Sequence, residues 1–275
     1  MDDEQAGWAH NGNVRLWWRR FEGRPGSVRL LLINGLGSPS VSFEAGFVER
    51  LVDAGFEVVC FDNRDVGRSS RTAVPYAASD MANDAGAVLD AAGWESAAVF
   101  GQSMGGMIAQ QLTIDHPARV THLISLMSST GNRTVGGSRQ SVREALMKVA
   151  PDDRSGWIDH RVETERYWAS PDLWNPQWVR AKGAAMFDHG VDPQGTQRQY
   201  QAVLTSPIRD EALRSLSVPC LVMHGSADTL IGPSAGRHTA DCIPGARYVE
   251  IDGLGHDLPP AMWDRLVAEI ADLVL

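Results

Sequence analysis

The sequence predicts an α/β protein with a mostly parallel sheet and helices on both faces of that sheet. Short apolar runs, rich in Val, Ile, Leu, Phe or Cys, recur along the chain, and each ends in Gly, Ser, Asn or Asp. Helical patterns lie between most of these runs. Continuous apolar runs are typical of strands buried on both faces, and their alternation with helices is typical of parallel sheets.

The N-terminal region indicates an antiparallel start to this sheet. Residues 14–23, VRLWWRRFEG, alternate well enough between apolar and polar side chains for an antiparallel strand. The Asn-Gly pair at Asn11 and Gly12 precedes them and indicates a hairpin turn.

Six further apolar runs predict the remaining strands. They occupy residues 28–37, 56–65, 96–103, 120–129, 219–228 and 247–256. Because continuous apolar runs of this length suit strands buried on both faces, we expect these strands to be covered on both sides.

Helical patterns follow the first three of the six runs, over residues 42–55, 78–93 and 104–117. Ser79 or Asp80 is the expected N-cap of the helix over 78–93, since short polar side chains favour that position. The pair His116-Pro117 closes the helix after it.

The alternation breaks between about Gly131 and Ser206. This stretch has the pattern of helix and loop without a convincing strand run, and strand-like sequence resumes at Val218. We therefore expect a helical insertion over 131–206 within a sheet domain formed by 1–130 and 207–275. The insertion contains four tryptophans, Trp157, Trp168, Trp174 and Trp178.

Composition narrows the class of function. The charged fraction of 21% is ordinary for a globular protein that is soluble in water. The net charge of −9, with no basic run, disfavours binding to nucleic acid or to an acidic membrane surface. No run approaches 18 apolar residues, so no membrane span is expected.

Cysteine usage predicts neither a disulfide framework nor a metal centre. The chain has three cysteines, Cys60, Cys220 and Cys242, and no CxxC pair. The N-terminus, MDDEQAGWAHNG, is acidic and lacks the apolar stretch of a secretory signal. We therefore expect a cytoplasmic protein with reduced thiols.

Ser103 is the expected nucleophile. It lies in a GxSxG motif, Gly101–Gly105, directly after the apolar run AAVF and at the start of a helical pattern. A strand–turn–helix setting of this kind is what a nucleophile elbow requires. The flanking glycines remove side chains that would clash in a sharp turn, and Gly106 would let the helix lie close to the sheet. The alternative at this point is a structural turn with an inert serine.

A serine hydroxyl needs a base, and the base needs an orienting acid. In this architecture the expected chain order is Ser, acid, His. Asp228 and His256 each follow an apolar run, and the carboxyl ends of parallel strands meet at one edge of the sheet. His224 is the weaker candidate base, since its place in a strand favours a packed or hydrogen-bonded role. Asp252 and Asp257 flank His256 and are weaker candidates for the acid.

Acyl transfer also needs donors for the developing oxyanion. The backbone N–H of Met104, directly after the nucleophile, is the first expected donor. The backbone N–H of Leu36, in the loop after an early strand, is the second. The alternative for the segment NGLG is a simple Gly-rich turn.

Taken together, these motifs resemble the α/β-hydrolase superfamily across nearly the whole chain. The segments that carry the resemblance are NGLG at 34–37, DNRDVGRSS at 62–70, GQSMGG at 101–106, HGSAD ending at Asp228 and GLGH ending at His256. Within the superfamily the sequence is most similar to bacterial esterases of the aclacinomycin methylesterase type. The resemblance implies the α/β-hydrolase fold, with an eight-stranded, mostly parallel sheet and a helical cap, over 131–206, above the active site.

Two segments depart from or extend the catalytic pattern. Many relatives have a histidine where this chain has Asn34, and an asparagine there can still hydrogen-bond the loop. In DNRDVGRSS, we expect Asp62, Arg64 and Ser69 to brace the loop by polar contacts, so Arg64 is interpreted as structural rather than catalytic.

The expected function is hydrolysis of carboxylic esters of small to medium apolar substrates through Ser103, His256 and Asp228. No metal and no organic cofactor is expected. The four tryptophans of the insertion either line an apolar pocket or pack the cap onto the sheet domain. A serine nucleophile disfavours the dehalogenases and epoxide hydrolases of the superfamily, which use aspartate.

Several alternatives stay open from the sequence. Carbon–carbon bond hydrolases, lactonases, perhydrolases and receptors that keep the triad without turnover share these motifs. The substrate within the ester class, and the choice between a monomer and a homodimer, are also open.

Overall fold

The computed structural model describes residues 5–275, and residues 1–4, the start of the acidic N-terminus, lie outside the described residues. Eight strands form one sheet in the order β1-β2-β4-β3-β5-β6-β7-β8. Their bounds are β1 Ala6–Asn11, β2 Val14–Phe21, β3 Val28–Ile33, β4 Phe56–Phe61, β5 Ala97–Gln102, β6 Val120–Leu126, β7 Cys220–Gly225 and β8 Arg247–Ile251. β2 pairs antiparallel with β1 and β4, and the pairs from β4 through β8 are parallel. The eight-stranded, mostly parallel sheet is confirmed.

Alternate residues of the central strands feed two separate cores, because successive side chains of a strand point to opposite faces. Leu31 and Ile33 of β3 belong to one core, whereas Leu30 and Leu32 belong to the other. All four are fully buried. This explains why the run is apolar throughout rather than alternating.

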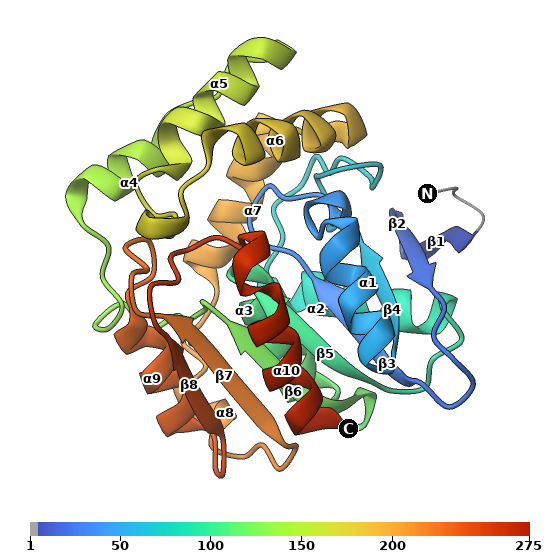
Figure 1. The fold of residues 1–275 in the computed structure, drawn as a ribbon. Helices are drawn as coiled ribbons and strands as arrows, with labels where there is room; N and C mark the ends of the chain where they lie inside the picture. Colours follow the sequence, from blue (N-terminus) through green and yellow to red (C-terminus); the bar gives the residue numbers. More distant parts are fainter. Residues whose placement is uncertain (1–4) are drawn as a thin grey trace.

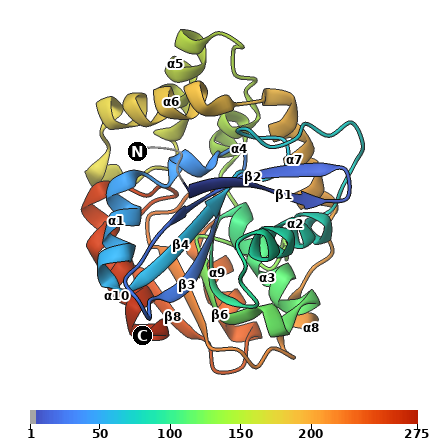
Figure 2. The same cartoon turned by 90° about the vertical axis from the view of Figure 1, so that its right-hand side faces the viewer.

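Helices cover both faces of the sheet (Figure 2). The flanking helices are α1 Ala45–Ala54, α2 Ala78–Ala91, α3 Met104–Asp115, α9 Pro233–Cys242 and α10 Trp263–Val274. α1 and α10 lie on one side, and α2 and α3 on the other (Figure 2). Short 3-10 turns, η2 Ser40–Ser42, η3 Pro117–Arg119 and η5 Pro260–Met262, complete the connections.

The predicted N-cap of α2 is wrong. The helix begins at Ala78, with Ala77 at the N-cap, so Ser79 and Asp80 both lie inside the first turn. The Asp80 carboxylate accepts the Ala77 N–H at 2.8 Å, and Ser206 Oγ accepts the Ala78 N–H at 3.2 Å. Side chains from inside and outside the helix therefore satisfy the N–H groups of Ala77 and Ala78 at its start.

Between β6 and β7 the chain forms helices and no strand. They are α4 Gln140–Met147, α5 Arg154–Glu165, η4 Pro171–Leu173, α6 Pro176–Gly190, α7 Pro193–Thr205 and α8 Asp210–Leu213. α5 and α6 lie above the sheet (Figure 1) and pack on each other around Trp157, Ile158 and Met186. Among residues 5–275, no helix is long and apolar enough to cross a membrane.

Candidate active site

Ser103 occupies a strained turn between β5 and α3. Its backbone φ is 56° and ψ is −121°, a conformation that a residue with a side chain rarely adopts. Its N–H donates to Leu126 O of the neighbouring strand at 2.9 Å. A Cβ on Gly101 would lie 2.2 Å from the Gly105 carbonyl oxygen, and one on Gly105 would lie 2.0 Å from Ile33 O. The turn therefore requires both glycines of the motif.

His256 lies in the loop after β8 and reaches the serine. Its Nε2 is 2.9 Å from Ser103 Oγ, and its Nδ1 is 2.6 Å from Asp228 Oδ2. Because a carboxylate can only accept, Nδ1 carries the hydrogen, which leaves Nε2 free to accept the serine proton. The three side chains that the sequence places at strand ends are thus brought together.

Asp228 is held by the loop that follows it. Its Oδ1 accepts the N–H groups of Leu230 and Ile231 at 2.9 and 3.0 Å. Burial acts to raise the pKa of this carboxyl, but the charge of His256 and hydrogen bonds from His224 and His256 outweigh it and lower the pKa to about 2. The carboxylate is therefore ionised over the whole neutral range.

Neither aspartate that flanks His256 replaces Asp228. Asp257 Oδ1 accepts the N–H and the hydroxyl of Ser170 at 3.0 and 2.6 Å, and burial raises the pKa of its carboxyl. Asp252 Oδ1 accepts the hydroxyl of Ser226 at 3.1 Å. Both carboxylates are committed to serine residues and not to the imidazole.

The predicted oxyanion donors lie on either side of the serine. Met104 begins α3, and Leu36 lies in the loop after β3. Neither N–H donates to an acceptor within residues 5–275, so both are free to bind a ligand oxygen. A Cβ on Gly35 would lie 3.3 Å from Ser103 Cβ, which places this loop directly beside the nucleophile. Asn34 Nδ2 donates to Pro39 O at 3.0 Å and holds the loop closed.

Asp62 braces the same loop from β4. Its Oδ1 accepts the Ser40 N–H at 2.7 Å, and its Oδ2 accepts the Arg68 N–H at 2.8 Å. Ser69 Oγ donates to Asp62 O at 2.6 Å. His189 of α6 adds a contact to Asp62 Oδ2 at 2.8 Å. The polar bracing expected for this segment is confirmed, and it also ties α6 to the sheet domain.

Arg64 is paired away from the triad. It binds both oxygens of Asp84 in α2, at 2.6 and 2.7 Å, and its guanidinium stacks 4.9 Å from the centre of the Tyr76 ring. The structural interpretation of Arg64 is confirmed. The sequence did not identify Asp84 as its partner, since nothing in the helical pattern of α2 marks a buried carboxylate.

The four tryptophans of the insertion have different environments. Trp157 is buried between α5 and α6, against Phe187 at 5.9 Å between ring centres. Trp178 Nε1 donates to Glu44 at 2.9 Å. Trp168 supplies its carbonyl oxygen to the His256 N–H at 2.6 Å. Trp174 is half-buried directly after η4.

A cation lies on the inner side of the same helix as Trp178. Lys182 Nζ is 5.0 Å from the centre of the Trp178 ring, and burial lowers the pKa of its ammonium to about 8. Glu44 and Asp257 act in the opposite direction. The underside of α6 therefore combines an aromatic ring with an ammonium group.

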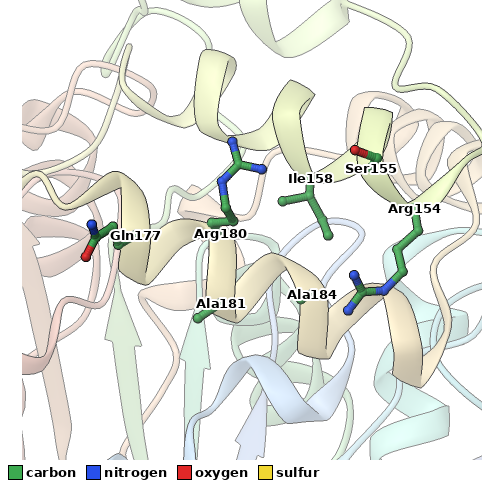
Figure 3. A pocket seen from close by; sticks show the side chains of 7 residues that line it. All are labelled: Arg154, Ser155, Ile158, Gln177, Arg180, Ala181 and Ala184. Atoms are coloured by element: carbon green, nitrogen blue, oxygen red, sulfur yellow. The ribbon is translucent and has the colours of Figure 1, made fainter.

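A groove of about 510 Å³ lies between α5 and α6 (Figure 3). Ile158, Ala181 and Ala184 form its apolar part, and Arg154 and Arg180 flank it. Each arginine is paired, Arg154 with Asp188 and Arg180 with Asp159. None of the residues that line this groove belongs to the Ser103, His256 and Asp228 constellation.

One cluster in the described part of the chain has metal-ligand chemistry. Asp210, His238 and Cys242 bring an oxygen, a nitrogen and a sulfur within 4.8 Å of one another. The Asp210 carboxylate already accepts hydrogen bonds from Asn132 and His238, both at 2.8 Å. These bonds account for the cluster without an ion.

The chain is similar to known proteins over most of its length. The family model described as alpha/beta hydrolase fold matches residues 28–259. The chain is 32% identical to rhodomycin D methylesterase DauP of Streptomyces sp. (strain C5), with 92% of this chain and 93% of that protein covered. It is also 32% identical to rhodomycin D methylesterase DnrP of Streptomyces peucetius, with 94% and 95% covered.

Solved structures give the same architecture. The enol-lactonase from Burkholderia xenovorans LB400 superposes with a TM-score of 0.82 at 24% identity, over 98% of this chain and 99% of that one. The esterase RhEst1 from Rhodococcus sp. ECU1013 superposes with a TM-score of 0.81 at 24% identity, over 98% of each chain. At this identity the likeness establishes the fold.

Proposed function

The chain belongs to the alpha/beta hydrolase fold family and is an ester hydrolase, and we propose that Ser103, His256 and Asp228 form its catalytic triad. The observation that carries this proposal is the unbroken chain of contacts, 2.9 Å from Ser103 Oγ to His256 Nε2 and 2.6 Å from His256 Nδ1 to Asp228 Oδ2. A strained serine in line with a base and a buried carboxylate is the arrangement that activates a hydroxyl.

Acylation follows from this geometry. Ser103 Oγ forms a bond to the carbonyl carbon of the ester, and its proton passes to His256 Nε2. The N–H groups of Leu36 and Met104 donate to the oxyanion, a contribution of about 3 kcal/mol per donor. Collapse of the intermediate breaks the ester C–O bond, and the leaving alkoxide takes the proton from His256. The alcohol departs, and the acyl group stays on Ser103.

Deacylation repeats these steps with water as the nucleophile. His256 Nε2 takes a proton from the water as its oxygen bonds to the acyl carbon. The second tetrahedral intermediate releases the carboxylic acid and returns the proton to Ser103 Oγ. Asp228 stabilises the imidazolium that forms in both halves and keeps the hydrogen of the neutral ring on Nδ1.

The proposed substrates are carboxylic esters of small to medium apolar molecules. The likeness to two rhodomycin D methylesterases supports a methyl ester as the scissile group. Residues 131–206 act as the cap in this proposal, and Trp168, Trp174 and Trp178 contribute to the pocket beneath it. Trp157, which packs between α5 and α6, supports the cap itself.

We further propose that the enzyme acts in the cytoplasm on a small molecule and needs no cofactor. All three cysteines are free and buried, in keeping with a reducing compartment. The triad supplies the nucleophile and the base, and the N–H groups of Leu36 and Met104 supply the oxyanion donors, so ester cleavage needs no cofactor.

A fluorophosphonate probe tests the nucleophile directly. We expect a single modified peptide that contains Ser103, lost in Ser103→Ala and strongly reduced in His256→Ala. Ser226→Ala is the matched control, because Ser226 lies in the loop before Asp228 and its hydroxyl bonds Asp252 and Gly253 rather than the triad. Labelling that persists in Ser103→Ala would refute the assignment.

A panel of p-nitrophenyl acyl esters and aryl methyl esters then tests the reaction. We expect rapid hydrolysis in the wild type and none above background in Ser103→Ala. Equal, slow hydrolysis in the wild type and in His256→Ala would favour a receptor that retains the triad. Turnover confined to lactones, to carbon–carbon substrates or to peroxide-dependent assays would replace the ester proposal by the corresponding class.

A further inference from the structure

A second histidine lies against the carboxylate of Asp228. His224 is the penultimate residue of β7, and its Nε2 is 3.2 Å from Asp228 Oδ2, the same oxygen that faces His256. The same Nε2 is 2.7 Å from the carbonyl oxygen of Ile231. One ring nitrogen therefore spans the start and the end of the loop from Asp228 to Ile231.

The hydrogen-bond partner of His224 shows which ring nitrogen carries a hydrogen. The carbonyl of Ile231 can only accept, so His224 Nε2 must carry a hydrogen. That N–H donates to the carbonyl of Ile231 at 2.7 Å and lies 3.2 Å from Asp228 Oδ2, close enough to attract the carboxylate. Nδ1, in contrast, is buried and has no hydrogen-bond partner among the residues that the structure describes.

The ring is also fixed in place by α9. A Cβ on Gly236 would lie 2.4 Å from His224 Nδ1, so only glycine leaves room for the imidazole there. The ring is fully buried between β7 and this helix. Its unpartnered nitrogen is unfavourable, and an apolar side chain of similar size would pack in this site without that cost. The feature that an apolar side chain cannot supply is the Nε2–H.

We infer that His224 is a positioning residue of the triad, whose Nε2–H holds the Asp228 carboxylate and its loop in the orientation that presents Oδ2 to His256. The inference rests on the proposed function, because it requires Asp228 to act on His256. It gives three of the four donors around the carboxylate a part in orienting it toward the fourth, His256. Leu230 and Ile231 fix Oδ1 through backbone N–H groups, and His224 fixes the direction of Oδ2.

The electrostatic effect of His224 on Asp228 also supports a positioning role. Burial acts to raise the pKa of Asp228, and the hydrogen bond from His224 is one of the contacts that lower it. His224 thus helps to keep the buried carboxylate charged while turning it toward the catalytic ring. It does not touch the substrate and takes no proton in the reaction.

Three variants test the inference on the whole chain with a p-nitrophenyl ester. His224→Leu removes the donor, whereas His224→Gln keeps an N–H at the same number of bonds from Cα. We expect kcat to fall about 10- to 100-fold in His224→Leu, as for loss of a hydrogen bond to a charged group. KM should change less than about twofold, and His224→Gln should restore kcat to within about threefold of the wild type.

Val222→Ala is the matched control. Val222 lies two residues earlier in β7 and is buried on the same face, so its truncation destabilises the strand without removing a donor. We expect a lower melting temperature and an unchanged kcat below it. A fall in kcat of the same size in Val222→Ala, or equal losses in His224→Leu and His224→Gln, would overturn the positioning role.

A measurement on the wild type covers the case in which His224→Leu does not fold. Side-chain ¹H–¹⁵N spectra distinguish the two neutral tautomers of each histidine. We expect His224 to carry its hydrogen on Nε2, and a hydrogen on Nδ1 instead would contradict the inference. The experiments also distinguish a failure of the inference about His224 from a failure of the proposed function. If the Ser103→Ala variant is inactive and the His224→Leu variant is fully active, only the role of His224 is refuted. If the Ser103→Ala variant is active, the proposed triad itself is refuted.

Discussion

The buried ion pair of Arg64 and Asp84 gives a sharp stability prediction. Arg64 donates to both oxygens of Asp84 at 2.6 and 2.7 Å, and Asn11 Nδ2 adds a third hydrogen bond at 2.9 Å. Only 7% of the Arg64 side chain and 1% of the Asp84 side chain are exposed. Arg64→Met retains much of the volume but leaves a buried carboxylate without its cation. Removal of one partner from such a pair costs about 3–5 kcal/mol of unfolding free energy.

Thermal unfolding measures this cost. For a chain of this size, 1 kcal/mol corresponds to about 2–4 °C, so the melting temperature should fall by about 6–20 °C. Arg64→Met with Asp84→Leu should recover much of the loss, because no buried charge then remains. Below the transition, kcat should stay within about threefold of the wild type, since Arg64 contacts α2 and not the triad.

The pH dependence of the stability of Arg64→Met tests whether the unpaired carboxylate of Asp84 causes the destabilisation. Burial raises the pKa of Asp84, and the hydrogen bond and charge of Arg64 act against that rise. Without Arg64 the pKa rises further, so the folded state binds the proton more tightly than the unfolded state does. Stability is then lost as the pH rises through the unfolded pKa toward the folded one. The deficit of Arg64→Met should therefore be largest at neutral pH and shrink in acid, and the double variant should show no such trend.

One outcome would refute the reasoning about this pair. If Arg64→Met kept the melting temperature of the wild type and lost kcat, Arg64 would belong to the catalytic machinery. A deficit that stayed constant across pH would show that lost packing, and not the uncompensated carboxylate, causes the destabilisation.

Four more predictions concern the site and the cysteines. Gly105→Ala should abolish soluble folded protein or reduce kcat at least about 100-fold, because its Cβ would lie 2.0 Å from Ile33 O; expression yield and kcat report this. Asp228→Asn should reduce kcat about 10³- to 10⁴-fold with KM nearly unchanged, since an amide favours the wrong imidazole tautomer; near-wild-type kcat would exclude its role. Because the pKa of Asp228 is lowered to about 2, its contribution to stability is present above its ordinary pKa of 3.8 and lost as the pH falls toward 2; acid unfolding of the wild type and of Asp228→Asn compares the two. The three free, buried cysteines should resist iodoacetamide in the native state, as mass spectrometry would show, and rapid alkylation would contradict their burial.

The parts of the fold that were predictable are those with local signals. The Asn-Gly pair marked the turn between β1 and β2, and continuous apolar runs marked strands that two helical layers cover. Ser103, Asp228 and His256 were predictable because their chain order and their places at strand ends are both informative. α9 and α10 were not identified, although the proline at the first position of α9 and the amphipathic pattern of α10 are local helix signals.

The parts that were not predictable depend on contacts between distant residues. The start of α2 after Ala77 is supported by Ser206, more than a hundred residues later, whose hydroxyl accepts the Ala78 N–H. The partnership of Arg64 with Asp84 and the contact of His224 with Asp228 have no separate signature in the sequence. The sequence favoured a hydrogen-bonded role for His224, but it could not show that its acceptor is the carbonyl of Ile231 or that the ring lies against Asp228.

The connection from α5 to η4 is hydrogen-bonded to the loops that carry Asp228 and His256, and this limits how the segment 131–206 can move. Trp168 O accepts the His256 N–H at 2.6 Å, Ser170 donates twice to Asp257, and Thr229 Oγ1 donates to Tyr167 O at 2.6 Å. A Cβ on Gly255 would lie 2.3 Å from the backbone of Ala169. Displacing this connection would break these bonds and release the loop that carries His256. Any movement of the segment that leaves His256 beside Ser103 must therefore occur in its other parts, while the connection stays in place.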